Sequence, residues 1–177
     1  MIPQPLHPAL VHFPVAFAVL LPVVAVVALL VIRRGSGARN VWLPVVALSG
    51  VLAFTSWIAV QTGEAQEDIV EEVVARSAIH EHEESAELVL ILSFLTFLLS
   101  AGGLATNRSG SRARVAATVL ALGVLGAAFR AGHSGGELVY ELGAAQAYTG
   151  PIAISSGGEA HGAEQGEVDR SGSEDRR

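Results

Sequence analysis

The sequence predicts an all-α fold, an integral membrane four-helix bundle with an amphipathic outer helix between the second and third spans. Hydrophobic residues make up 51% of the chain and charged residues only 16%, and the two classes are segregated along it. Four apolar stretches are each near or above the roughly 20 residues that a helix needs to cross the hydrocarbon core. They lack the polar stripe that a helix of a soluble protein would show. The stretches are 8–32, 41–62, 86–105 and 113–132.

The first two stretches each carry a further signal of a membrane span. Met1–Leu6 contains no basic residue, and the apolar run that follows is too long for a typical signal-peptide core, so we expect an uncleaved span. Pro8 and Pro14 predict a local bend near the start of this span. In the second stretch, Trp42 and Trp57 fall near opposite ends, where interfacial anchors are expected.

The connection over residues 63–85 shows a helical spacing of acidic and apolar residues. The acidic ones recur at i, i+3, i+4, i+7 and i+8, and the apolar ones occupy the opposite side, which predicts an amphipathic helix at the outer surface, running on from the second span. The acidic side is interpreted first as solvated surface and alternatively as a surface that collects cations near the histidines. The acidic residues are Glu64, Glu67, Asp68, Glu71 and Glu72, and the apolar ones are Ile69, Val70, Val73 and Val74.

The placement of arginine predicts the orientation, because the chain contains no lysine. Arginine is concentrated in the two short loops that follow the first and third spans, and basic loops of this length stay cytoplasmic. The prediction is a multi-pass protein of the plasma (inner) membrane, in contact with the lipid bilayer, with the N-terminus, the C-terminus and residues 63–85 outside. The loop arginines are Arg33, Arg34, Arg39, Arg108, Arg112 and Arg114.

The domain organisation is simple. Residues 1–149 are predicted to form one membrane domain, and the Gly/Ser-rich acidic segment 150–177 a disordered tail, in which His161 has no assigned role. The absence of cysteine excludes thiolate ligands, iron–sulfur clusters and thioether-attached haem. The sequence shows no phosphate loop, nucleophile triad or nucleic-acid patch. It therefore favours an electron-transfer or binding protein over a stand-alone enzyme, and we expect no nucleic-acid partner.

Five of the six histidines lie at the ends of apolar segments, all on the predicted outer side. An imidazole beside a bilayer is costly without a partner, so these residues point to a shared ligand, of which a haem iron or another transition metal is the natural candidate. His7 also fits a role near the N-cap of the first helix. His12 follows five residues later, which corresponds to about 140° of helical rotation. The two imidazoles would therefore share a ligand only if the chain bends near Pro8.

His80 and His82 open the third span within the segment HEHEE, which lacks the HExxH zinc motif. On a helix, His80 shares a face with three glutamates and is expected to be solvated. His82 shares a face with Ala86 and Val89, so it is expected to point into the bundle.

His133 lies in the segment GHSGGE at the outer end of the fourth span. Arg130, one turn earlier, is a candidate partner for a haem propionate. Gly132, Gly135 and Gly136 would let a neighbouring helix or a flat ring approach closely. The alternative interpretation is a helix C-cap followed by a flexible outer segment.

Four sequence motifs together resemble a bacterial membrane-protein family known as domain of unknown function 2231. They are LHPALVHFPVAF, TGEAQED, the His82–Glu83 dipeptide and GHSGGELVYELG. The resemblance covers about residues 4–145 and implies a four-span membrane protein with histidines at one end; the family label brings no established activity. The motif positions are His7, Pro8, His12, Pro14, Thr62, Gly63, His82, Gly132, His133, Gly135, Gly136 and Tyr140.

The leading functional prediction is that helices near the outer face bind b-type haem or a similar metal. Two histidines from different spans can fill both axial positions of a haem iron, which suits electron transfer with a redox protein or a quinone. The expected ligand pair is His12 with His82 or His133, and these three residues also form the expected metal set. The expected cofactor-binding residues are His7, His12, His82, His133, Arg130, Gly135 and Gly136.

Two alternatives belong to other functional classes. In the first, the histidines bind or transport a divalent metal such as copper, zinc or iron, since imidazole suits all three. In the second, the protein is a structural membrane subunit without a cofactor, and its histidines make hydrogen bonds between helices.

Overall fold

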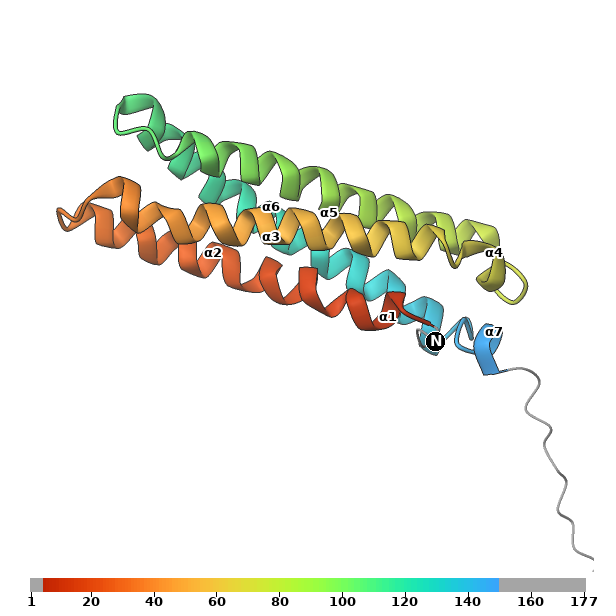
Figure 1. Ribbon diagram of the computed structural model, residues 1–177. Coiled ribbons are helices and arrows are strands. Elements are labelled where there is room, and N and C mark those ends of the chain that lie inside the picture. The colour runs from red at the N-terminus through yellow and green to blue at the C-terminus, as the bar shows by residue number, and fades with distance from the viewer. Residues whose placement is uncertain (1–4, 150–177) are drawn as a thin grey trace, which may run out of the picture.

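The computed structural model of the protein describes residues 5–149, and within them the chain forms helices and no strands. Four helices are long, and the other three are single turns grouped at one end of the molecule (Figure 1). The predicted tail, 150–177, lies outside the described residues. In chain order the helices are α1 (His7–Leu10), α2 (His12–Arg33), α3 (Ala38–Glu64), α4 (Glu67–Val70), α5 (Arg76–Gly102), α6 (Arg108–Tyr140) and α7 (Gln146–Thr149).

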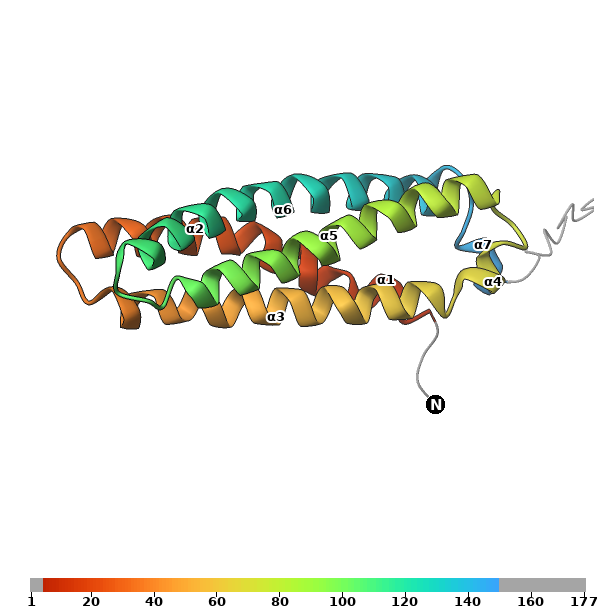
Figure 2. The same ribbon diagram turned by 90° about the horizontal axis from the view of Figure 1, so that it is seen from above.

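The four long helices form a closed bundle. Helix α2 packs against α3 and α6, and α5 packs against the same two helices from the other side, with neighbours running in opposite directions (Figures 1 and 2). All four are long and apolar enough to cross a membrane, which confirms the predicted fold. Loops 34–37 and 103–107 lie together at one end, called here the arginine end. Helices α1, α4 and α7 lie at the other, called here the histidine end.

Many of the side chains in the bundle interior are small, and many large apolar side chains face outward. Ala18, Ala25 and Ala121 are almost completely buried, while Phe54 is 59% and Phe129 79% exposed. Small residues let helices approach closely, and packing drives their association where the solvent is itself apolar. The outer surface of the bundle is therefore suited to hydrocarbon, and the core gives little room for a ligand along most of its length.

The arginine end is tightly packed. The Trp42 indole Nε1 donates to the Ser100 carbonyl at 2.9 Å, and the buried Arg114 guanidinium donates to the carbonyls of Gly103 and Ala105. The Arg114 bonds satisfy two carbonyls of the loop that follows α5, and the Trp42 bond adds a second donor to the Ser100 carbonyl, which also accepts from the Gly103 amide. Gly103 has no room for a side chain, because a Cβ there would lie 2.5 Å from Trp42 Nε1.

At the histidine end the first span is interrupted, as the prolines predict. Helix α1 ends at Leu10 and α2 begins at His12, with Val11 between them. Pro14 has no N–H to bond the carbonyl of Leu10, so the helical ladder is broken at this point. The break reorients α1, and with it His7, relative to the rest of the span.

The predicted outer helix between the second and third spans is present as the single turn α4, shorter than the acidic spacing suggests. After it the chain turns so that Val74 and Ile79 pack against Leu138 and Ala144 from the end of α6 and the loop beyond it. Burial of these apolar side chains favours the turn over a continuous surface helix, which would leave Val74 in water.

Helix α6 continues past His133, so the interpretation of His133 as a C-cap is wrong. The helix ends at Tyr140, where the Leu142 amide donates to the Glu137 carbonyl and Gly143 adopts a positive φ of 77°. This ending is typical of helices that close with a left-handed glycine. The chain then returns across the histidine end, and the Tyr148 hydroxyl donates to Gln66 Oε1 at 2.9 Å.

Candidate ligand site at the histidine end

A cavity of about 1000 Å³ opens at the histidine end of the bundle. Every helix that the structure describes contributes to its lining. The walls are mainly apolar, with a few polar side chains among them, including His7, His82 and Ser56. A concave, largely apolar space of this size with a few placed polar groups is typical of a small-molecule or cofactor site.

His7 reaches the cavity from α1 and is held by α3. Its Nδ1 lies 2.9 Å from the Ala59 carbonyl oxygen and 3.3 Å from Thr62 Oγ1. Because a carbonyl only accepts, Nδ1 carries the proton and donates it. The ring also rests on Gly63, where a Cβ would lie 3.2 Å from His7 Cε1. The neutral imidazole therefore keeps the lone pair on Nε2.

His82 reaches the same cavity from α5 and is held by α6 in a similar way. Its Nδ1 lies 3.0 Å from Ser134 Oγ, and that hydroxyl donates its own proton to the Ala131 carbonyl at 3.1 Å. Ser134 is therefore the acceptor of the bond from His82, and the neutral ring again keeps its lone pair on Nε2. A Cβ at Gly135 would lie only 3.0 Å from His82 Cε1, so glycine makes room for the ring.

The two imidazoles form a pair. Their ring centroids are 6.2 Å apart and their planes are nearly perpendicular, at 83°. Each is half-buried and comes from one helix, while a second helix binds its Nδ1 and leaves space for the ring at a glycine. Such bonds orient an imidazole and raise the basicity of its other nitrogen, as they do for metal-bound histidines.

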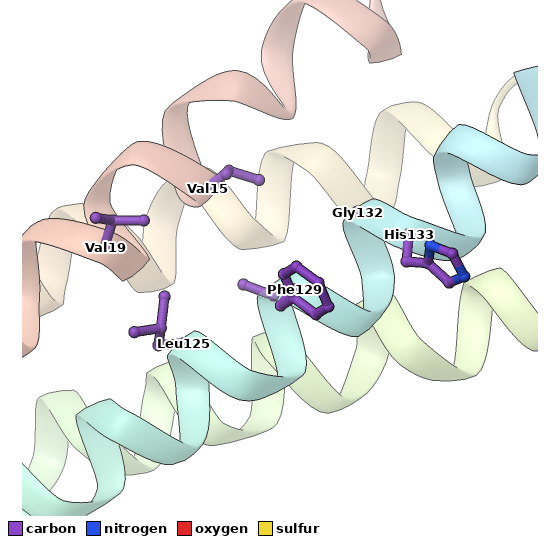
Figure 3. Close-up of a pocket in the computed structure, with 7 residues that line it drawn as sticks. Val15, Val19, Leu125, Phe129, Gly132 and His133 are labelled. Atoms are coloured by element: carbon purple, nitrogen blue, oxygen red, sulfur yellow. The ribbon is translucent and has the colours of Figure 1, made fainter.

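The remaining predicted residues divide between the cavity and the outer surface. His12 is exposed yet lines the cavity, and Gly136 lines it as well. His133 is exposed and lines a separate groove on the outside of α6 (Figure 3). Arg130 is exposed, with Nη2 3.9 Å from Glu81 Oε1.

The expected convergence of His12, His82 and His133 is therefore wrong for His133, and His7 takes the place beside His82. Successive residues of a helix differ by about 100° in direction, so an inward Ser134 turns His133 outward. Within residues 5–149, no group of three or more histidine, aspartate or glutamate side chains is arranged to hold one metal ion. That the histidines, Arg130 and the glycines bind a cofactor stays a prediction.

His80 behaves as predicted. Its side chain is 69% exposed and lies 3.4 Å from Glu84 and 3.7 Å from Glu83. His80 and Glu84 are directed to water, whereas Glu83 is partly buried and lines the cavity with His82.

Residues 3–147 match the family described as predicted membrane protein, DUF2231. The chain belongs to this family. The match covers nearly the whole described chain and confirms the resemblance that the motifs indicated. No curated protein and no solved structure matches the chain.

In this DUF2231 protein the motifs meet at one place. His7 from the first motif lies against Thr62 and Gly63 from the second, and His82 lies against Gly135 from the last. The rings of His7 and His82 are neighbours, so all of these motif residues lie at one site. Thr62, Gly63 and Gly135 therefore have a physical role, which is to position the histidine rings.

The sequence does not predict two site residues of the DUF2231 protein, Ser134 and Ser56. Ser134 directly follows the candidate ligand His133, and its position within the glycine-rich segment GHSGG is the one sequence feature that indicates a role. Ser56 is 3% exposed and lines the cavity, and its Oγ has no hydrogen-bond partner within the described residues. No sequence pattern distinguishes Ser56 from the other serines of the spans.

Proposed function

We propose that this DUF2231 protein binds a b-type haem at the histidine end, where His7 and His82 would hold it, and that it serves electron transfer. The observation that supports this most directly is the pairing of two imidazoles whose Nδ1 atoms are committed to protein oxygens. In both rings Nε2 remains to bind iron. Ligating histidines have this arrangement in metal sites generally.

The spacing of the pair would allow both rings to hold one iron. Two imidazoles that each bind the same metal ion at about 2 Å would have ring centroids at most about 6 Å apart. The observed separation is 6.2 Å. The cavity beside the pair has about 1000 Å³, and Gly132 and Gly136 on α6 leave its wall free of side chains at two positions. A flat macrocycle can therefore approach the helix backbone there.

The protein's own residues would set the properties of the bound group. Ala59 and Ser134 hold the two rings in one orientation. A haem held by both histidines would supply electron transfer rather than oxygen activation. The apolar part of the walls would tune the redox potential by lowering the polarity around the bound group. The Ser56 hydroxyl can donate to a polar group of the ligand.

The proposed orientation has the histidine end outside and the arginine end in the cytoplasm. It rests on six arginines in or beside the two short loops at the arginine end, since such residues favour the cytoplasmic side. The ligand would then be accessible to partners outside the plasma membrane.

A second candidate is a divalent metal ion held by the same two histidines. The carboxylates of Glu64, Glu67, Glu83 and Glu87 line the same cavity and would attract a cation to it, although within residues 5–149 they do not form a metal site of three or more ligands with the histidines. Oxygen and imidazole ligands together suit zinc, copper or iron. This candidate shares the histidine pair with the haem proposal but predicts a different spectrum.

The test is an absorption spectrum with metal analysis on the full chain purified from its native membrane. We expect a Soret band and about one haem per protein, and loss of haem in His7→Ala and His82→Ala. The matched control is His80→Ala, two residues from His82 on the water-facing side of the same helix, which should keep full occupancy. Helix content and elution volume verify that each variant is folded.

The other outcomes discriminate clearly between the candidates. A colourless protein that contains stoichiometric zinc, lost in His82→Ala, overturns haem in favour of the metal ion. Equal haem occupancy in wild type and His82→Ala contradicts the ligand assignment. A colourless, metal-free wild type contradicts both candidates and leaves a structural role for the pair.

A further inference from the structure

A second hollow lies on the outer surface of the bundle, between α2 and α6. It has a volume of about 360 Å³, and its walls are apolar except at one end (Figure 3). Val15 and Val19 come from α2, and Leu125 and Phe129 from α6. Val15, Val19 and Phe129 belong to the exposed apolar surface of two spans and Leu125 is half-buried beside them, so the groove opens toward the lipid rather than toward water.

The end of the groove toward the histidine end combines an imidazole with an aromatic ring. Phe129 and His133 are four residues apart on α6, so they share one face of the helix, as Figure 3 shows. Both are exposed, Phe129 to 79%. A phenyl ring offers a face for stacking a flat ring. The imidazole offers a hydrogen-bond donor for a carbonyl.

The groove is next to the central cavity. Val15, Ala128 and Gly132 line both hollows, so a wall one residue thick separates them. At Gly132 that wall has no side chain, and a Cβ there would meet no atom within 4 Å. A ring bound beside His133 would therefore lie close to the space that holds the His7–His82 pair.

We propose that this groove binds an isoprenoid quinone from the bilayer. The quinone ring lies on Phe129 and accepts a hydrogen bond from His133, while its apolar tail follows Leu125 and Val19 into the hydrocarbon. From His133 to Leu125 the helix rises about 12 Å, which accommodates the first part of an isoprenoid chain. The role of the quinone as redox partner rests on the proposed haem function, whereas its binding does not.

The chemistry of the groove favours a quinone over a phospholipid. The polar group at its end is an imidazole, and the guanidinium on the same turn, that of Arg130, lies beside Glu81. An anionic phosphate head group is usually held by arginine or lysine, which offer charge and several donors. A single imidazole beside a phenyl ring matches a flat, uncharged carbonyl compound better.

The test uses the full chain in lipid nanodiscs and a benzoquinone with a decyl tail as the probe, with binding measured by calorimetric titration. We expect saturable binding in the wild type and at least a tenfold weaker affinity in His133→Ala, as for the loss of one hydrogen bond of about 1.4 kcal/mol. Val19→Trp, which fills the groove without touching the central cavity, should abolish binding. Phe94→Ala is the matched control, because Phe94 is also lipid-facing, on α5, and is 53% exposed.

Haem content is measured in the same samples, so the two proposals can fail separately. Groove-dependent quinone binding by a colourless protein supports the quinone site and contradicts the haem. A haem-loaded protein with equal quinone affinity in wild type, His133→Ala and Val19→Trp overturns the quinone site alone. Displacement of the probe by phosphatidylglycerol, with no preference for the quinone, also overturns it and identifies the groove as a lipid site.

Discussion

Side chains connect neighbouring helices at both ends of the bundle, but they leave different amounts of space between the helix ends. At the arginine end, the Trp42 and Arg114 side chains fill the space between helix ends and satisfy backbone carbonyls. At the histidine end, two imidazoles also bond to neighbouring helices, yet a cavity of about 1000 Å³ remains beside them. The side chains of the arginine end leave it closely packed, whereas those of the histidine end surround an open cavity.

The difference follows from the chemistry of the side chains. Indole and guanidinium groups only donate, so Trp42 and Arg114, whose side-chain hydrogen bonds within the described residues all go to carbonyls, offer no lone pair to a metal or to a donor group of a ligand. A neutral imidazole donates from one nitrogen and accepts at the other. At the histidine end the donor side is used for packing, and the acceptor side remains for chemistry. Trp42 and Arg114 are therefore structural, while His7 and His82 are suited to bind.

The strongest test of the comparison is whether the two ends face different compartments. An alkaline phosphatase reporter fused after Arg177 should be fully active, because the arginine loops are expected to stay in the cytoplasm and the tail outside. The same reporter placed in the loop 34–37 should be inactive. The orientation would be refuted by activity in the loop fusion together with silence in the tail fusion.

The next effect concerns the tolerance of each end to a single methyl group. Gly103→Ala should lower the free energy of unfolding by about 3 kcal/mol, because the new Cβ would overlap Trp42 Nε1 and Arg114. Gly135→Ala should cost only about 1 kcal/mol, since its neighbour is the edge of a His82 ring that can shift, but it should weaken ligand binding. Thermal unfolding of each variant in one detergent measures the difference.

Gly126→Ala serves as the control for both substitutions, because no atom lies within 4 Å of its Cβ position. It should leave stability unchanged or raise it by up to about 1 kcal/mol through helix propensity. Equal destabilisation by Gly103→Ala and Gly135→Ala would contradict the conclusion that the arginine end is packed more tightly than the histidine end.

A smaller effect is expected from the groups that hold the imidazoles. Ser134→Ala removes the acceptor of the His82 Nδ1 proton, so ligand affinity should fall at least tenfold while stability falls by about 1 kcal/mol. Ser111→Ala, an exposed serine on the same helix, should change neither. Ligand titration against both variants decides the matter, and wild-type affinity in Ser134→Ala would remove any positioning role for this serine.

The smallest effect is predicted for the buried hydroxyl on the cavity wall. Without ligand, Ser56→Ala should be neutral or stabilising by up to about 1 kcal/mol, because its Oγ has no partner within the described residues. Ser49→Ala, two turns earlier on α3, should instead destabilise by about 1 kcal/mol, because its hydroxyl donates to the Val46 carbonyl. Chemical unfolding of the two variants compares them directly, and an equal loss would indicate that Ser56 is satisfied.

The fold was predictable because its signals are local. Four apolar runs of membrane length and prolines near the start of the first span each act within one segment of chain. His82 was assigned to the interior and His80 to water for the same reason, since the residues one turn away already distinguish the two faces of α5. The extension of α6 to Tyr140 was missed because the glycine-rich segment resembles a helix end.

The partner of His82 was not predictable, because it depends on how helices rotate against one another. The sequence by itself determined that histidines gather at one end of a four-helix membrane bundle, since hydropathy and loop length decide which span ends lie together. Only the tertiary structure decided that His7 faces His82 and that Ser134, not His133, faces inward. The bend at Val11 and the rotation of α6 set those directions, and packing between segments about 50 residues apart fixes both.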